Sequence, residues 1–320
     1  MSPVAVNKTR TLKAGVHVPV LTFFESTAAQ DIDIPVYENH VRRMAAAGVE
    51  SIVVLGSTGE AVTLSLEEKK QLISVTRKVL DGIGFEEMPV IAGLATQSTR
   101  EAMASADAFA QAGADYLLAL PPSYYAGAMT KAAIKGFYTD LADASPIPVI
   151  IYSYPGVSSG LELDSEDVLE ISTHRNIRGI KQTDHNVGKM ARIAAGSPDP
   201  SSFAVLGGAS EYLIGSLAVG AIGCITGMAN LTPVTCVRAY KAWQAGDYKE
   251  AQRLQGLIAT GEWAFGKNSL PGVKAGMNQY VGYGGVCRKP VPEASADIKA
   301  WTNKQLEPLF AQERAFTTKN

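Results

Sequence analysis

A lysine ends a short apolar stretch in residues 177–186, which read "IRGIKQTDHN". An ammonium group is strongly hydrated, so directing Lys181 into an apolar interior costs several kcal/mol unless the group is paired, neutral or engaged in chemistry. A lysine in such an interior favours its neutral, nucleophilic form, and this form makes a Schiff base with a carbonyl substrate. The alternative is a structural lysine paired with an acid, for which Glu60 is the candidate among the expected strand ends.

Tyrosines end two further apolar stretches. In "YSYPG", Tyr152 and Tyr154 share one face of a strand and Ser153 takes the other, because side chains alternate along a strand. One of the two tyrosines is a candidate for proton transfer, and a core phenol with a satisfied hydroxyl is the alternative. In "PPSYY", Tyr124 and Tyr125 stand on a rim, where an aromatic pair more often packs or contacts another subunit than takes part in chemistry.

The stretch "GSTGE" at 56–60 combines Ser57 and Thr58 with flanking glycines. Glycines let backbone N–H groups approach an anion closely, and the two hydroxyls add donors, so this stretch is a candidate carboxylate site. A glycine-rich turn that caps the next helix would show the same pattern.

Metal chemistry has little support in the sequence. The histidines show no metal-ligand spacing with one another or with acids on strand ends, and we interpret them as structural or surface residues: His17, His40, His174 and His185. The cysteines are too few and too far apart for a disulfide framework or a Cys-rich zinc site, which favours buried reduced thiols in an intracellular protein: Cys224, Cys236 and Cys287. We therefore expect no metal site.

Composition narrows the class of partner. The 29 basic and 31 acidic residues give a net charge of −2 without long blocks of one sign, so a nucleic-acid partner is not indicated and a small molecule fits better. No apolar run is long enough to span a membrane. The segment with Lys8, Arg10 and Lys13 weakly resembles an organellar presequence but lacks convincing length and amphipathicity. We therefore expect a cytoplasmic protein, with a mitochondrial location as the alternative.

The elements that must position these residues alternate along the chain. Short apolar runs begin near residues 16, 49, 89, 115, 148, 177, 203 and 221, and segments of helical period separate them. Eight apolar strands, each followed by a helix, predict an α/β fold of the (β/α)8 TIM barrel type, with a doubly wound open sheet as the alternative.

More helix follows the eighth strand than one barrel helix needs. We therefore expect a barrel through strand eight (1–232), then the last barrel helix with a C-terminal helical extension (233–320), packed with the barrel as one domain. "VGYGG" at 281–285 lacks the spacing and context of a dinucleotide site and predicts a bend in this extension.

Taken together and in order, "GSTGEAVTLSLEEK", "PPSYY", "YSYPG" and "GIKQTD" resemble the dihydrodipicolinate synthase / N-acetylneuraminate lyase family of class I pyruvate-type aldolases. The resemblance implies that Lys181 forms an imine with the C2 carbonyl of a 2-keto acid and that Tyr152 is the catalytic tyrosine. It also implies that Ser57 and Thr58 hold the substrate carboxylate, and that Tyr125 reaches into a neighbouring subunit of a homodimer or homotetramer.

The implied enzyme is a carbon–carbon lyase that needs no metal or organic cofactor. The protonated imine is an electron sink, so the C3–C4 bond of a 4-hydroxy-2-keto acid can break as Tyr152 takes the C4 hydroxyl proton. Gly56 and Ile225 complete the set of residues that we expect to contact the substrate.

One departure from the family pattern bears on the substrate. In dihydrodipicolinate synthases, the segment that follows strand five resembles P-x-R-T-G, and its arginine binds a carboxylate. This chain reads "PGVSSG" at 155–160 instead. Without that guanidinium, Ser158 and Ser159 suit hydroxyl groups, as on glyceraldehyde. The chain therefore looks most like a 2-keto-3-deoxy sugar acid aldolase. The alternatives, in order, are a 4-hydroxy-2-oxoglutarate aldolase, a dihydrodipicolinate synthase and a non-catalytic keto-acid binding protein.

Overall fold

The strands form at the expected places in the computed structural model, which describes residues 10–197 and 201–318. Within these residues, eight parallel strands pair in chain order and β8 pairs with β1, so the sheet closes into a barrel. The strands are β1 (Gly15–Pro19), β2 (Ser51–Val54), β3 (Val90–Leu94), β4 (Tyr116–Ala119), β5 (Val149–Ser153), β6 (Ile177–Gln182), β7 (Ala204–Gly207) and β8 (Gly223–Ile225). The predicted TIM barrel is confirmed and the open sheet is wrong.

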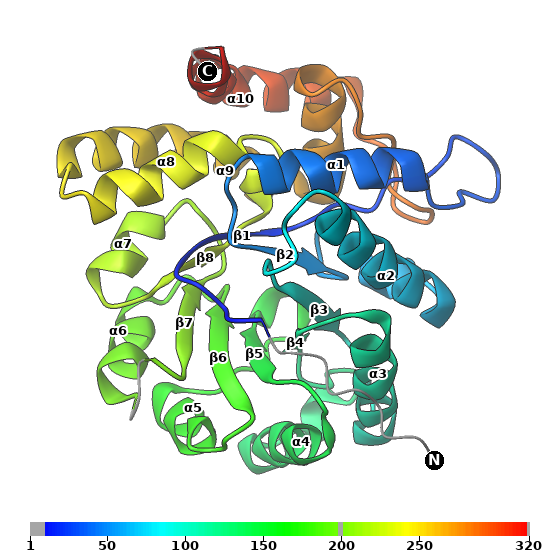
Figure 1. Cartoon of the computed structure of the whole chain (residues 1–320), viewed down its shortest axis with the longest axis vertical. Coiled ribbons are helices and arrows are strands. Elements are labelled where there is room, and N and C mark those ends of the chain that lie inside the picture. The colour runs from blue at the N-terminus through cyan, green and yellow to red at the C-terminus, as the bar shows by residue number, and fades with distance from the viewer. Residues whose placement is uncertain (1–9, 198–200, 319–320) are drawn as a thin grey trace.

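Helices surround the strands, as Figure 1 shows. They are α1 (Ile34–Ala46), α2 (Leu66–Gly82), α3 (Thr99–Ala112), α4 (Lys131–Ala144), α5 (Ser165–Ser172), α6 (Val187–Gly196), α7 (Leu213–Ala218), α8 (Pro233–Gln244), α9 (Tyr248–Tyr280) and α10 (Ala296–Thr317). Short 3-10 helices follow four of the strands: η1 (Ala61–Thr63), η2 (Ala126–Ala128), η3 (Pro155–Val157) and η4 (Gly227–Asn230).

The buried apolar side chains form two separate clusters. One core lies inside the barrel and includes Ile150 and Leu206, while a larger one fills the space between the barrel and its helices. Strands that are buried on both faces need nearly continuous apolar sequence, which is why they were recognisable from their runs. The cysteines are buried and unbonded, as predicted, and the bend at 281–285 ends α9.

The C-terminal extension packs on the barrel rather than apart from it. Helix α9 contacts α8, and α10 lies against both. Helix α9 is not continuous, because Ser269 has non-helical backbone angles (φ 50°, ψ −155°) and Pro271 follows. Proline has no backbone N–H to donate to the hydrogen-bond ladder of a helix, and this explains the break beside Pro271.

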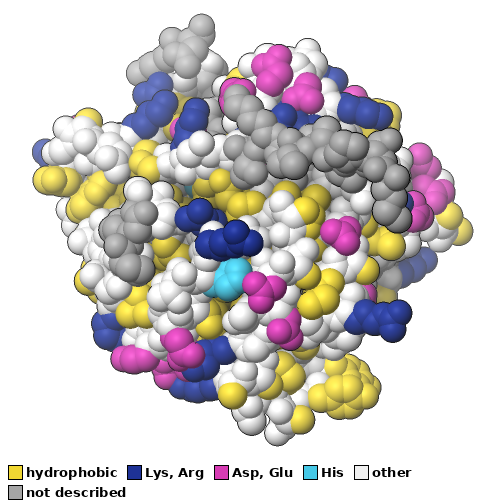
Figure 2. Space-filling model, turned by 60° about the horizontal axis from the view of Figure 1, so that its bottom comes forward, with side chains coloured by type: hydrophobic (Ala, Val, Ile, Leu, Met, Phe, Trp, Pro, Cys, Tyr) yellow, Lys and Arg dark blue, Asp and Glu magenta, His cyan; other side chains and the backbone are white. Residues whose placement is uncertain are grey.

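Figure 2 shows basic and acidic side chains interspersed over one face of the molecule. No helix among residues 10–197 and 201–318 combines the length and apolarity needed to cross a bilayer. Lys8 lies outside the described residues, so our interpretation of the basic N-terminal segment stays a prediction. Arg10, in contrast, forms an ion pair with Asp115 at 2.9 Å.

Candidate active site

A cavity of about 540 Å³ opens at the carboxyl ends of the strands. Residues at or just after every strand contribute to its wall, and one face of α9 completes it. This end of a TIM barrel carries the active site in characterised enzymes of the fold, and the volume suits a small organic substrate.

Lys181 lies at this end of β6, with 4% of its surface exposed, and lines the cavity. Its Nζ donates a hydrogen bond of 2.9 Å to the hydroxyl of Tyr152, the residue beside it on β5. Within the described residues, Lys181 forms no ion pair with an acid. Glu60, the partner considered from the sequence, pairs instead with Lys274 of α9 at 2.6 Å. The interpretation of Lys181 as a structural salt-bridge lysine is therefore wrong.

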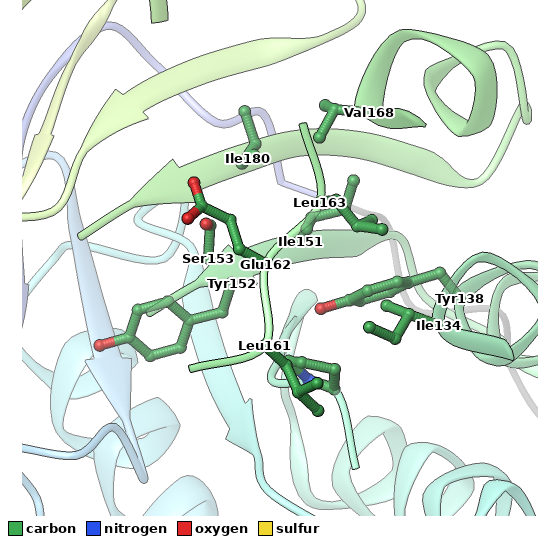
Figure 3. Close-up of a pocket in the computed structure, with 11 residues that line it drawn as sticks. Ile134, Tyr138, Ile151, Tyr152, Ser153, Leu161, Glu162, Leu163, Val168 and Ile180 are labelled. Atoms are coloured by element: carbon green, nitrogen blue, oxygen red, sulfur yellow. The ribbon is translucent and has the colours of Figure 1, made fainter. Parts of the chain in front are cut away.

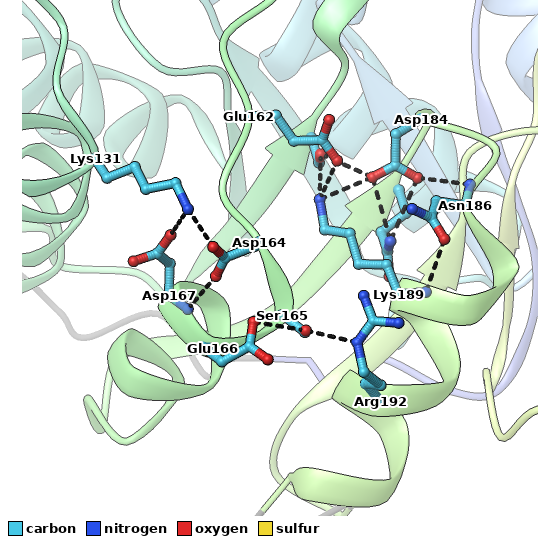
Figure 4. Close-up of polar contacts among 12 residues, drawn as sticks. Lys131, Glu162, Asp164, Ser165, Glu166, Asp167, Asp184, Asn186, Lys189 and Arg192 are labelled. Carbon is cyan, nitrogen blue, oxygen red and sulfur yellow. Dashed lines mark hydrogen bonds and ion pairs between the residues drawn. The ribbon is translucent and has the colours of Figure 1, made fainter.

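A second buried lysine shows what a structural lysine looks like in this protein. Nζ of Lys189 on α6 lies 2.9 Å from Asp184 and 2.7 Å from Glu162, and Figure 4 shows the three side chains converging. Two carboxylates offset the cost of burying this ammonium, so Lys189 has a charge-balanced role. Among residues 10–197 and 201–318, the polar partner of the Lys181 nitrogen is the Tyr152 phenol alone, which leaves this nitrogen available to a substrate.

The two tyrosines of "YSYPG" face the same cavity, Tyr152 from β5 and Tyr154 from the residue directly after this strand. Their ring centroids lie 5.8 Å apart, and both rings line the cavity. Ser153 points to another side of the strand, as Figure 3 shows, and its hydroxyl donates to Asp184 at 3.2 Å. The predicted alternation is confirmed. Tyr152 contacts Lys181 whereas Tyr154 does not, and burial raises the pKa of Tyr154.

The loop after β2 brings Gly56, Ser57 and Thr58 into the cavity wall. A close backbone approach shapes this loop: a Cβ on Gly93 of β3 would lie 2.0 Å from the carbonyl oxygen of Leu55, so only glycine fits there. Leu55 itself has a positive φ of 64°. The neighbouring strand therefore helps to hold the loop in a shape that a simple capping turn would not need.

The C-terminal extension holds the other end of the same loop. Besides pairing with Lys274, the carboxylate of Glu60 accepts a 2.9 Å hydrogen bond from the backbone N–H of Arg288. The Arg288 guanidinium in turn pairs with Glu68 on α2 at 2.6 Å. These contacts anchor the segment that carries Ser57 and Thr58 from both sides.

Four predicted residues lie outside the cavity wall. The structure corrects the placement of Ser158 and Ser159, because the η3 turn directs Val157 to the cavity, buries Ser158 and exposes Ser159. Ile225 packs in the barrel interior beside Leu206, beneath the cavity. Tyr125 is 74% exposed, with its ring 5.0 Å from that of Tyr124, so in this chain it faces outward.

Several residues that line the cavity were not singled out from the sequence. Thr183 and His185 follow β6 directly, and the run "KQTDH" could have suggested them. His185, which we interpreted as structural or surface, is exposed but also lines the cavity, with Nδ1 2.9 Å from Glu211. A further set comes from α9, which carries no local signal of proximity to the strand ends: Glu262, Phe265, Gly266, Ser269, Leu270 and Val273.

The other histidines have structural surroundings, as predicted. His17 and His40 are fully buried, and burial lowers the pKa of His17 to about 4 and that of His40 to about 3, so both rings are neutral at pH 7. His174 is half-buried, with Nε2 3.0 Å from Asp143. In the described part of the chain, no three His, Cys, Asp or Glu side chains are arranged to hold a metal ion.

Comparison with known proteins adds to this geometry. The model of the dihydrodipicolinate synthetase family matches residues 13–309. A protein of Emericella nidulans, named a probable mitochondrial 4-hydroxy-2-oxoglutarate aldolase, is 42% identical over 305 residues, covering 95% of this chain and 97% of that one. The L-threo-3-deoxy-hexylosonate aldolase of Hypocrea jecorina is 38% identical over 286 residues, covering 88% and 90%. The crystal structure of a dihydrodipicolinate synthase family protein from Coccidioides immitis matches with a TM-score of 0.85 at 32% identity, covering 95% and 98%.

Proposed function

The chain belongs to the dihydrodipicolinate synthetase family, and from this premise we propose that it is a Schiff-base aldolase that reversibly cleaves a 2-keto-3-deoxy sugar acid to pyruvate and glyceraldehyde. Its named relatives are aldolases, which are carbon–carbon lyases. The observation that carries the proposal is the 2.9 Å contact between Lys181 Nζ and the Tyr152 hydroxyl inside a cavity of substrate size.

The proposed reaction begins with the substrate carboxylate at Ser57 and Thr58, where hydroxyl and backbone donors are available. Nζ of Lys181 attacks the C2 carbonyl, and loss of water leaves a protonated imine. In that loss of water the Tyr152 hydroxyl supplies the proton, and the phenolate so formed then takes the C4 hydroxyl proton. The C3–C4 bond breaks, and its electron pair passes into the imine to give an enamine and a free aldehyde. Protonation at C3 and hydrolysis release pyruvate and restore Lys181. The imine acts as the electron sink, so we propose that no metal or organic cofactor takes part.

The residues that line the cavity support a substrate whose aldehyde-forming part is uncharged. Lys181 and His185 are the basic residues in the described wall, which contains no arginine. A second substrate carboxylate would therefore lack the bidentate partner that arginine provides. Hydroxyl and amide side chains are present, including those of Gln97, Ser123 and Thr183. The activity in the name of the Hypocrea jecorina relative agrees with a deoxy sugar acid substrate.

A second candidate function is cleavage of 4-hydroxy-2-oxoglutarate. The name of the Emericella nidulans relative favours it, and so does the position of His185, whose imidazole N–H can donate to a second carboxylate in the cavity. Glu211 already pairs with this ring, which reduces its value as a partner for a substrate carboxylate. We therefore place this function second.

The choice of aldehyde is testable by condensation with pyruvate. We expect kcat/KM for glyceraldehyde to exceed that for glyoxylate or aspartate semialdehyde by about 10-fold or more, since a missing charge-assisted hydrogen bond commonly costs about 1.5–3 kcal/mol. Each acceptor is assayed at a fixed pyruvate concentration. A preference for glyoxylate would assign the chain to 4-hydroxy-2-oxoglutarate cleavage, and one for aspartate semialdehyde would assign it to dihydrodipicolinate synthesis.

We also propose a homodimer or homotetramer with Tyr125 near a subunit interface. The exposed pair of Tyr124 and Tyr125 supports this, because a large aromatic surface is seldom left in water without a partner. As for location, the name of the Emericella nidulans relative strengthens the mitochondrial alternative over the cytoplasmic one.

A further inference from the structure

A buried carboxylate on α9 lies in the cavity wall and has no part in the reaction proposed above. Glu262 is 8% exposed and accepts a 2.6 Å hydrogen bond from Ser210 Oγ. The hydroxyl of Thr226 lies 3.2 Å from its other oxygen and 2.9 Å from Ser210. Ser210 belongs to the loop after β7 and Thr226 follows β8, so one side chain of the C-terminal extension joins two active-site loops.

These loops carry cavity-lining residues. Gly208, Ala209 and Glu211 surround Ser210, and Gly227 follows Thr226. Two helical turns before Glu262, Gln255 donates to the backbone carbonyls of Ser210 and Glu211 at 2.8 and 2.9 Å. Helix α9 therefore holds the loop after β7 at two points, of which Glu262 is the one that can change its charge.

We propose that Glu262 is a positioning residue of the aldol reaction, and that its ionised form holds the loops after β7 and β8 in the shape that the substrate requires. The inference rests on the proposed function. An ionised carboxylate only accepts hydrogen bonds, which matches the donors that Ser210 and Thr226 present to it. A protonated carboxyl donates from one of its oxygens, so the hydroxyl of Thr226 must accept from it instead of donating to it. The charge-assisted hydrogen bonds that hold the two loops then become weaker neutral ones.

The change of state falls in the neutral range. Burial raises the pKa of Glu262 to about 7, with the nearby charge of Glu211 adding to the rise and the Ser210 hydrogen bond opposing it. Tyr212, Cys224 and Cys236 also face this group, but burial raises the pKa of each, so they stay neutral. As the pH rises through about 7, Glu262 loses its proton and the loop-holding form becomes dominant.

The test is the pH dependence of kcat/KM for glyceraldehyde with the whole protein. We expect the wild type to show an activity that increases with pH, with an inflection near 7, and Glu262→Gln to lack that inflection. Glutamine resembles the protonated acid in carrying both a donor and an acceptor, so the variant should stay near the acidic-limb activity of the wild type, about 10-fold below it at alkaline pH. A Glu262→Gln profile that keeps the inflection would overturn the proposal.

Two control variants separate this role from others. Glu313→Gln replaces another buried carboxylate of the extension, which accepts from Thr235 and lies outside the cavity wall, and should keep the inflection. His185→Gln, which removes the imidazole that pairs with Glu211, should also keep it. Loss of the inflection in His185→Gln together with its retention in Glu262→Gln would assign it to the histidine and reject our proposal.

A third variant covers the case in which Glu262→Gln does not fold. Ser210→Ala removes a hydrogen bond that lowers the pKa of Glu262, so the inflection should move to higher pH. An unmoved inflection would contradict the proposal. Borohydride trapping of pyruvate should proceed in all of these variants, because Lys181 is intact. A wild type that traps pyruvate but turns over no aldehyde would instead reject the proposed function, and this inference with it.

Discussion

Lys181→Ala is expected to abolish the borohydride-trapped adduct with pyruvate and to lower aldol turnover by about 10⁴-fold or more, because the imine cannot form without the amine. The nitrogen lies 2.9 Å from a phenol and in a cavity wall, where a keto acid can reach it. Mass spectrometry of the reduced protein measures the adduct, and a lyase assay measures turnover. A non-catalytic keto-acid binding protein would bind pyruvate without forming the adduct.

Peptide mapping of the wild-type adduct supplies the control. We expect the added mass on Lys181 and none on Lys189, which is equally buried but held by Asp184 and Glu162. Alanine at position 181 removes a buried amine that has no carboxylate partner in the described structure, so the thermal midpoint should not decrease much. An adduct on another lysine, or undiminished trapping in the variant, would refute the assignment.

Tyr152→Phe should lower turnover by about 10²–10⁴-fold, which is the usual cost of removing a positioned proton-transfer group. Imine formation should persist at least in part, because Lys181 remains in the cavity. The measurement is therefore a pair: single-turnover cleavage, which should be slow, and borohydride trapping, which should survive.

Tyr154→Phe is the matched control. It removes a hydroxyl from the same cavity face, with its ring 5.8 Å from that of Tyr152, but not one in contact with Lys181. We expect it to affect turnover much less. Equal losses in the two variants, or normal turnover in Tyr152→Phe, would show that the contact with Lys181 does not identify the catalytic tyrosine.

The barrel and the central pair could be predicted from the sequence for one physical reason. Strands buried on both faces need continuous apolar runs, and eight such runs separated by helical segments imply a closed parallel sheet. Once the barrel is expected, the ends of all the runs lie at the same mouth, and polar residues on the inner face of their strands point into it. Lys181 and Tyr152 therefore converge by position alone, and their observed contact follows from the pairing of β5 with β6.

Residues in loops were predicted less well. In "PGVSSG", the sequence shows the absence of an arginine but not the backbone path, and the η3 turn brings Val157 rather than Ser158 or Ser159 into the wall. A tight turn redirects each side chain by a large angle, so the order of residues in a loop does not give their direction as it does in a strand.

The sequence by itself determined the closed barrel, the buried lysine at its mouth and the missing arginine, since each depends on residue type and on a regular local period. Only the tertiary structure decided that Glu60 pairs with Lys274, which leaves Lys181 without an acid partner in the part of the chain that the structure describes, and that α9 places Glu262 against the loops after β7 and β8. Those contacts join segments far apart in the chain, and the packing of the C-terminal extension on the barrel sets them. No local pattern encodes which segments pack together. A helix with one buried face can be identified from its period, but the surface that covers this face cannot.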